Sequence, residues 1–307
     1  MPRLLSTILV VALLGGTAAA FAVTQGLKIR PSPITAPSIQ KVFSPTCDCA
    51  TRVASIRFRL RKPDRVRLQI VDDNGSVVRT LVPGKRLRRG TVTYTWNGRD
   101  DDGQFVPQGV YKPRVHLADQ HRTIDLPNEM QVDTTVPRIS IVALEPRTIS
   151  PNGDGRDDRI RVAYRITEPA HAMLYVDGTR EIYTRRRLQR STLDWNGKVK
   201  GKAPAPGTYR VWLSAEDPAG NVSNGQVVRV LVRYVELARD SIRARAGTRF
   251  GVRVLADRRV HWRLGRRQGT AAPGLMILQA PATSGRYRLV VTVPGHAAAA
   301  TVNVSPR

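Results

Sequence analysis

The sequence predicts an all-β protein built of tandem β-sandwiches that follow an N-terminal transmembrane or signal helix. From residue 39 onward, short alternating apolar and polar segments are broken by Gly, Asn, Asp and Pro at intervals of about 8 to 12 residues. A helical apolar period is not sustained after the leader. Two stretches also carry Ser-Pro, Trp-Asn-Gly and Gly-x-Tyr in the same order, which indicates two copies of one small domain.

The N-terminal segment has the composition of an export signal. Arg3 precedes an uncharged apolar stretch, residues 4–23, that ends in small residues. A stretch of this length can span a hydrocarbon core of about 30 Å, whereas the apolar part of a cleaved signal is usually shorter. Residues 1–24 are therefore either a signal peptide or a membrane anchor helix, and the protein is expected outside the cytoplasm, secreted or membrane-anchored. Residues 25–38 contain three prolines and are expected to form an extended tether.

Three domains are expected after the tether, separated at a proline-terminated linker, residues 132–137, and near residue 233. The first, residues 39–134, has expected strands at 55–60, 65–71, 77–81, 91–96 and 110–118. The second, residues 138–232, has expected strands at 159–166, 172–176, 191–195, 207–216 and 226–233. The third, residues 233–307, is expected to be another sandwich with strands at 250–255, 260–264, 287–293 and 299–304.

The residues repeated between the two copies are typical of a scaffold. Trp96 and Trp195 are large enough to fill the space between two sheets, and each is followed by Asn-Gly, which supplies the positive φ of a tight turn. Tyr111 and Tyr209 can bury a ring and keep the hydroxyl at the edge. These positions indicate structure rather than chemistry.

Residues 71–81, 96–100 and 106–111 resemble the immunoglobulin-like (Ig-like) domain named after the flagellar hook-capping protein, the FlgD-type domain. The second copy is similar to it but shorter, and its residues 150–158 resemble the SPNGDG-type opening of bacterial cell-surface sandwich modules. Residues 216–221 look like the end of a bacterial Ig-like repeat. The resemblance implies tandem Ig-like β-sandwiches in an exported bacterial protein, and it implies the fold more than a function.

The only two cysteines, Cys47 and Cys49, align with Gly153 and Gly155 of the second copy. Replacement of two permissive glycines by cysteines in an exported protein favours a small disulfide ring that fixes the same turn. A redox or metal role is the alternative, but a single C-x-C pair without partner cysteines is a weak signal for it.

Four oxygen donors, Asn152, Asp154, Asp157 and Asp158, lie within seven residues and suit a hard cation such as calcium. Arg156 occupies the place where an EF-hand loop needs an oxygen ligand. The favoured alternative is an Asx-type turn with two permissive glycines. No other cofactor is expected.

The chain is strongly basic, with 50 Lys and Arg against 24 Asp and Glu and a formal net charge of +26. Many arginines alternate with apolar residues and are expected on solvent-facing sides of strands. Two clusters precede the Trp-bearing strands and are expected at one edge: Lys85, Arg86, Arg88 and Arg89, and Arg185, Arg186, Arg187 and Arg190. They either bind anionic envelope polymers or acidic lipid headgroups, or they are solvated hairpins that protect a sheet edge. Nucleic acid is not an expected partner, since the clusters contain no stacking aromatic residues.

No catalytic residues are expected, because the five histidines are scattered without an accompanying nucleophile motif. The sequence therefore predicts a non-enzymatic cell-envelope protein with a structural or adhesive role and a polymer or protein partner. If the leader is uncleaved, the membrane is a further partner. Two alternatives remain, namely polymer binding through the basic edge and an accessory module of an extracellular enzyme. The oligomeric state does not follow from the sequence.

Overall fold

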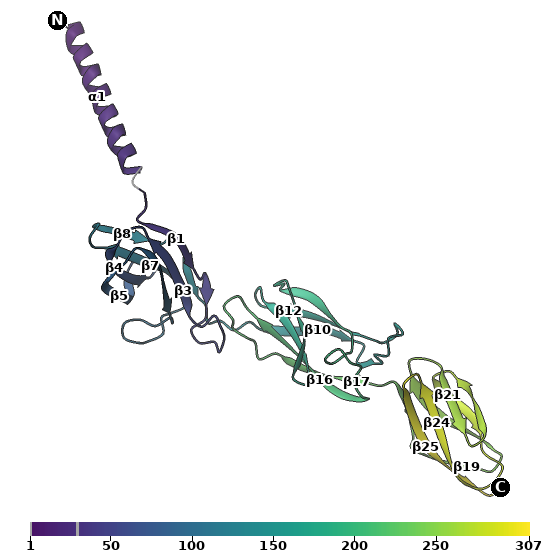
Figure 1. Ribbon diagram of the computed structural model, residues 1–307. Helices are drawn as coiled ribbons and strands as arrows, with labels where there is room; N and C mark the ends of the chain where they lie inside the picture. Colours follow the sequence, from purple (N-terminus) through teal and green to yellow (C-terminus); the bar gives the residue numbers. More distant parts are fainter. Residues whose placement is uncertain (1, 29–30) are drawn as a thin grey trace. The chain divides into compact units, whose positions relative to one another are not determined.

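The computed structural model describes residues 2–28 and 31–307, so Met1 of the expected leader and residues 29–30 of the expected tether lie outside the described residues. The chain divides into two compact units, Met1–Thr134 and Thr135–Arg307. One N-terminal helix is followed by strands that form three β-sandwiches (Figure 1). The expected all-β class is therefore confirmed.

The N-terminal helix α1 (Pro2–Lys28) contains the apolar stretch of the leader. Leu and Ala dominate this segment, and both have high helix propensity. Within the part of the chain that the structure describes, no helix combines the length and apolarity that crossing a membrane requires.

The first sandwich lies in the first unit, and its larger sheet runs in the order β2-β9-β7-β4-β5, with β8 beside β7. The other sheet has the order β1-β3-β6. Phe43, Trp96 and Tyr111 fill the space between the sheets, with edge-to-face ring contacts at centroid distances of 5.4 and 5.2 Å. The strands are β1 (Ile34–Ile39), β2 (Val42–Phe43), β3 (Ala54–Leu60), β4 (Asp64–Val71), β5 (Val77–Leu87), β6 (Gly90–Trp96), β7 (Gly109–Leu117), β8 (Arg122–Asp125) and β9 (Met130–Val132).

The second sandwich has sheets of order β10-β12-β15 and β11-β17-β16-β13-β14. Its strands are β10 (Ile139–Glu145), β11 (Thr148–Ile149), β12 (Ile160–Ile166), β13 (His171–Val176), β14 (Thr179–Tyr183), β15 (Arg190–Trp195), β16 (Gly207–Glu216) and β17 (Gln226–Val232). The third sandwich repeats this plan with sheets β18-β20-β23 and β19-β25-β24-β21-β22. Its strands are β18 (Val235–Leu237), β19 (Ser241–Arg245), β20 (Arg249–Ala256), β21 (Val260–Leu264), β22 (Arg267–Ala271), β23 (Gly274–Gln279), β24 (Gly285–Val293) and β25 (His296–Ser305).

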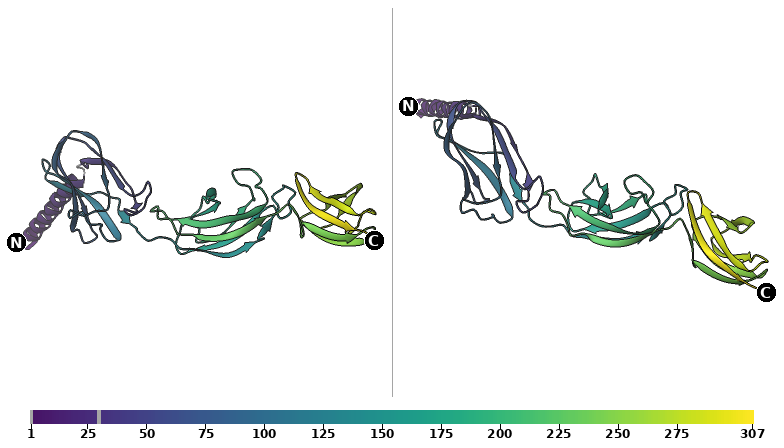
Figure 2. Two further views of the ribbon diagram at one scale, coloured as in Figure 1. Left: turned by 90° about the horizontal axis from the view of Figure 1, so that it is seen from below. Right: turned by 60° about the horizontal axis from the view of Figure 1, so that its bottom comes forward.

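All three sandwiches have the same topology, and Figure 2 shows the two layers of strands in each. In every copy a short early strand pairs in parallel with the last strand, namely β2 with β9, β11 with β17 and β19 with β25. The third segment, which the sequence predicted to be another sandwich, is thus a third copy of the same topology. The second and third sandwiches share one hydrophobic core cluster.

The expected tether, residues 25–38, is corrected at both ends. Helix α1 extends to Lys28, and β1 begins at Ile34. Pro37 is tolerated in this strand because β1 lies at a sheet edge and its pairing with β3 shifts register between Thr35 and Ser38. An edge strand with a bulge does not need a hydrogen bond from every residue, so the proline did not mark a tether.

The repeated Ser-Pro and Trp-Asn-Gly motifs contact each other. A Cβ atom on Gly98 would lie 2.7 Å from Cβ of Pro45, and one on Gly197 would lie 2.6 Å from Cβ of Pro151. Both glycines also have positive φ, +71° and +72°. The two motifs therefore occur together in both copies because the glycine of one packs against the proline of the other.

The Gly-x-Tyr motif is used identically in all three sandwiches. The hydroxyl of each tyrosine donates to a backbone carbonyl four residues earlier: Tyr111 to Pro107 (2.8 Å), Tyr209 to Ala205 (2.9 Å) and Tyr287 to Thr283 (3.0 Å). This bond closes the turn that leads into the strand and gives the phenol a partner.

Candidate functional site

The structure joins Cys47 and Cys49 in a disulfide, with their Cα atoms 5.3 Å apart. The bridge lies in the loop between β2 and β3, at the place that the two-glycine turn occupies in the second sandwich. Cys47 also lines a surface hollow of about 690 Å³ together with Arg52, Arg99 and Phe105. The guanidinium of Arg99 lies 3.8 Å from the ring centroid of Phe105, so the wall of this hollow is a cation–π pair.

The loop that carries the candidate calcium ligands, between β11 and β12, is organised by hydrogen bonds within the protein. The carboxylate of Asp158 accepts from the backbone N–H groups of Gly153 (2.8 Å) and Gly155 (2.5 Å). The side-chain oxygen of Asn152 accepts from the N–H of Asp154 at 3.0 Å. The Asn152 bond, to the N–H two residues on, is of the Asx type that the sequence favoured for this loop, whereas the carboxylate of Asp158 reaches back to the N–H groups of both glycines.

Asp154 uses its carboxylate to hold the third sandwich. One oxygen accepts from the backbone N–H of Arg156 at 2.9 Å, and the other accepts from Nε of Arg258 at 2.9 Å and also from its Nη2. Asn152 makes a second contact to the same loop, donating to Asp257 at 2.8 Å. The structure therefore brings Asn152, Asp154 and Asp158 into one loop, but it gives their oxygens protein donors.

The charge state of Asp154 follows from these contacts. Burial acts to raise the pKa of this carboxyl, because burial penalises the charged form. The hydrogen bonds from Arg156 and Arg258, with the positive charges of both side chains, outweigh burial and place the pKa below its usual value. Asp157 lies apart from this network, with its exposed side chain at a hollow that Arg159 and Arg161 also line.

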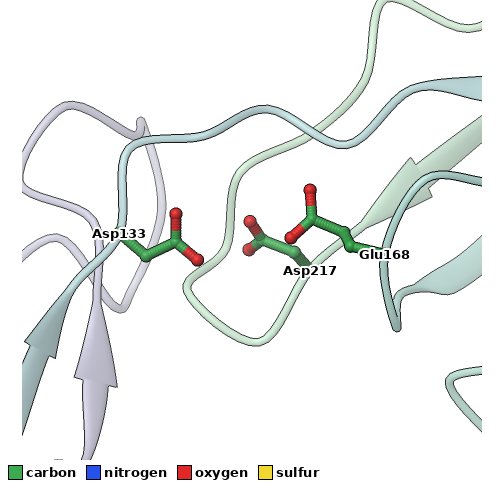
Figure 3. A group of neighbouring side chains, drawn as sticks. All are labelled: Asp133, Glu168 and Asp217. Atoms are coloured by element: carbon green, nitrogen blue, oxygen red, sulfur yellow. The ribbon is translucent and has the colours of Figure 1, made fainter. Parts of the chain in front are cut away.

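Figure 3 shows three carboxylates, of which Glu168 and Asp217 belong to the second unit and Asp133 to the first. Both oxygens of Asp217 accept hydrogen bonds from Asn221, one from its backbone N–H (2.9 Å) and one from its side-chain amide (2.8 Å). These bonds close the turn of the expected Ig-like ending, residues 216–221. Because the three carboxylates belong to two separate units, we assign no cation site to this group.

Both basic clusters lie on the connection that crosses from the large sheet to the small sheet. Lys85 and Arg86 are in the end of β5, and Arg88 and Arg89 are in the turn before β6. Arg185, Arg186 and Arg187 lie in the equivalent connection between β14 and β15, and Arg190 begins β15. All eight side chains are exposed.

The contacts of the clusters differ in one respect. Nη1 of Arg86 pairs with the carboxylate of Asp119 at 2.7 Å, between two largely exposed side chains. The third sandwich does not continue the clusters, because Arg266 and Arg267 lie at the turn between β21 and β22 rather than on the crossing connection.

The described residues contain no histidine that is hydrogen-bonded to a carboxylate in the manner of a catalytic base. His116 contacts the hydroxyl of Thr123 at 3.0 Å, and His171 contacts the carbonyl oxygen of Thr184 at 2.6 Å. His296 stacks on the buried ring of Tyr234 with centroids 3.6 Å apart. These contacts are those of packing residues.

Topology and the repeated Trp and Tyr contacts define a protein of tandem Ig-like β-sandwiches. Within it, residues 46–120 match the family model of the FlgD Ig-like domain. The basal-body rod modification protein FlgD of Salmonella typhimurium (strain LT2) is 49% identical over 62 residues, and the match covers 20% of this chain and 26% of that protein. FlgD of Salmonella typhi matches equally. The resemblance of the first copy is thus confirmed, for one module and not for the whole length of these relatives.

Two solved structures are also similar to parts of this chain. The fibronectin(III)-like modules of Clostridium thermocellum CbhA are 16% identical, with 65% of this chain and 93% of that chain covered and a TM-score of 0.37. FlgD from P. aeruginosa is 21% identical, with 31% and 67% covered and a TM-score of 0.23.

Proposed function

We propose that this chain is a non-enzymatic, exported cell-envelope protein whose Ig-like modules have a structural or adhesive role. The main support is that the residues repeated between the two copies make structural contacts. The glycines of the motifs lie against the prolines, and the Trp and Tyr side chains donate to backbone carbonyl oxygens. They build a scaffold and leave no shared group for a reaction. The curated relatives are named basal-body rod modification proteins, and from that name we propose only a structural role for this chain.

The apolar leader and the Cys47–Cys49 bridge support an extracytoplasmic location, because disulfides persist in oxidising compartments. The test is fractionation of cells that express the chain with a C-terminal tag, followed by determination of the mature N-terminus by mass spectrometry. We expect the tagged protein outside the cytoplasm, with its cysteines protected from alkylation until a reductant is added. Cytoplasmic protein with free thiols would contradict the proposal.

A second function, binding of anionic envelope polymers, is favoured by the equivalent positions of the two basic clusters. Two copies that carry exposed arginines on the same connection can each contact a polyanion, and such contacts weaken as salt rises. The test variant is Arg86→Ser, Arg88→Ser, Arg185→Ser and Arg187→Ser, applied to immobilised dextran sulfate. We expect it to elute at clearly lower salt than the unaltered protein.

The matched control removes four exposed arginines from other strands: Arg57→Ser, Arg59→Ser, Arg243→Ser and Arg245→Ser. Because this control lowers the net charge by the same amount, it distinguishes binding by the two basic clusters from the general attraction of a positively charged protein to a polyanion. Equal shifts for the two variants would show that the clusters have no special role.

A further inference from the structure

The outer face of the large sheet in the second sandwich carries a row of apolar side chains. Tyr175 of β13, Trp212 of β16 and Val227 of β17 stand opposite each other across three neighbouring strands. The rings of Tyr175 and Trp212 are 5.0 Å apart with an interplanar angle of 32°, and Val227 is 52% exposed. We call these three residues the aromatic row.

The fold itself does not require the aromatic row. Trp212 lies three residues after the tyrosine of the Gly-x-Tyr motif and pairs with Tyr175 on the neighbouring strand. The equivalent pairs in the other two sandwiches are Arg114 with Gln69 in the first and Val290 with Arg263 in the third. Those copies form the same sheets without aromatic rings at this place. The row is therefore a feature of the second sandwich alone.

Trp212 is held in place by the loop that follows its strand. Its indole N–H donates to the carbonyl oxygen of Asn224 at 3.1 Å. A Cβ atom on Gly225 would lie 1.9 Å from Nε1, so only glycine allows the ring to lie against this backbone. A ring fixed before binding loses little conformational freedom when a ligand packs on it.

Three arginines surround the row. Arg180 stands opposite Tyr175 on the neighbouring strand. Arg210 lies two residues before Trp212 on β16, Arg229 lies two residues after Val227 on β17, and these two arginines stand opposite each other. Because residues two apart on a strand share a face, all three belong to the same surface as the row. Their side chains are exposed, and among the described residues none of them forms an ion pair.

A hollow of about 570 Å³ lies beside the indole and is lined by Trp212, Val227, Arg210, Asp177 and Asn224 among others. The carboxylate of Asp177 accepts the backbone N–H of Arg210 at 2.9 Å and keeps further acceptor capacity. The hollow thus combines a ring, a guanidinium donor and a carboxylate acceptor.

We propose that this face, formed by the aromatic row with Arg180, Arg210 and Arg229, binds an acidic polysaccharide of the uronic-acid class. The C–H groups on a sugar ring carry partial positive charge and pack on the negative face of an indole or phenol. Sugar carboxylates pair with guanidinium groups, and sugar hydroxyls donate to a carboxylate such as that of Asp177. The inference goes beyond the basic clusters, because it rests on a different surface and needs stacking as well as charge.

Single-stranded nucleic acid also stacks on aromatic rings and pairs with arginine. The carboxylate of Asp177 in the hollow favours a sugar, because a uronic-acid ring offers hydroxyl donors beside its carboxylate, whereas the backbone of single-stranded DNA offers none. An acidic peptide has the charge but lacks rings of C–H groups that match two adjacent aromatic side chains.

The test measures binding of the full chain to immobilised polygalacturonate at about 0.3 M NaCl, where purely electrostatic attraction is strongly screened. The main variant is Val227→Glu, which places a charge in the row at an exposed position with little effect on the core. We expect its affinity to fall at least about tenfold, because the carboxylate must be desolvated and faces sugar carboxylates. Trp212→Ala should lose binding as well, with its melting temperature measured in parallel.

The matched control is Val142→Glu, which makes the same change at a 67% exposed valine on the opposite sheet of the same sandwich. It should bind polygalacturonate within about twofold of the unaltered protein. Equal loss for Val142→Glu and Val227→Glu would overturn the proposal, as would unchanged binding by Val227→Glu.

Other polymers decide the class of ligand. Neutral dextran should bind weakly, since it offers no carboxylate, and equal or tighter binding to polyglutamate or to single-stranded poly(dT) would overturn the assignment to a polysaccharide. The four-serine variant of the basic clusters should keep its polygalacturonate binding at this salt. If it loses binding while Val227→Glu keeps it, the basic edge is supported and this inference fails.

Discussion

At the scale of single residues, the contact between Gly98 and Pro45 explains why the Trp-Asn-Gly and Ser-Pro motifs occur together. In Gly98→Ala the new methyl group meets the proline ring at a backbone φ of +71°, so overpacking adds to backbone strain. We expect a loss of about 2–4 kcal/mol in the free energy of unfolding, measured by urea denaturation of the full chain.

Gly103 provides the matched control, because it has a similar φ of +80° and nothing within 4 Å of an added Cβ. Gly103→Ala should cost about 1 kcal/mol, the strain alone. If both variants lose the same amount, the proline contact does not matter. Comparison of the two copies in the sequence revealed the shared turn residues. It could not show that the Ser-Pro and Trp-Asn-Gly motifs contact each other, because that contact depends on the tertiary fold.

At the scale of the elements, alternation predicted most long strands to within a few residues, as for 55–60 against β3 and 207–216 against β16. It missed short or edge strands such as β1, where Pro37 suggested a tether. An edge strand buries little and can bulge, so its sequence carries a weak period. Tertiary pairing, rather than local preference, creates these elements.

The same limit applies to the sites. The Asx-type turns of Asn152 and Asp154 could be predicted from the sequence, because each hydrogen bond joins residues only two positions apart. Its bond to Arg258 could not, since nothing in the loop identifies a partner in another sandwich. Tyr175 and Trp212 lay in correctly expected strands, but their contact depends on the register between β13 and β16.

The loop between β2 and β3 allows a prediction at the element scale. Cys47→Gly with Cys49→Gly gives the first copy the glycines of the second. The disulfide closes a very short loop, so the chain-entropy model gives a loss of about 1–2 kcal/mol in the free energy of unfolding. Urea denaturation with and without a reductant measures it. The reductant should destabilise the unaltered protein by the same amount and leave the variant unchanged, whereas a sensitive variant would exclude the bridge as the cause.

At the scale of the molecule, Thr135–Arg307 is one compact unit although it contains two sandwiches. Buried residues of both belong to a single core cluster, and Tyr234, just before β18, stacks on His296 of the third sandwich. The ion pair between Asp154 and Arg258 adds a polar contact between the same two sandwiches. We therefore expect this unit to unfold in one calorimetric transition.

Acid should weaken that coupling. The pKa of Asp154 is lowered in the folded protein, because bonds from Arg156 and Arg258 outweigh the opposing effect of burial. Its stabilisation is therefore complete above the ordinary carboxyl pKa of 3.8 and is lost as the pH falls through the lower folded value. Calorimetry at pH 7 should show Asp154→Asn lowering the melting temperature of this unit by about 3–6 °C, and the difference should be smaller at an acidic pH below 3.8. The control Asp157→Asn, in the same loop but exposed, should melt like the unaltered protein at both pH values. A difference that persists unchanged in acid, or that Asp157→Asn reproduces, would show that the charge of Asp154 does not join the two sandwiches.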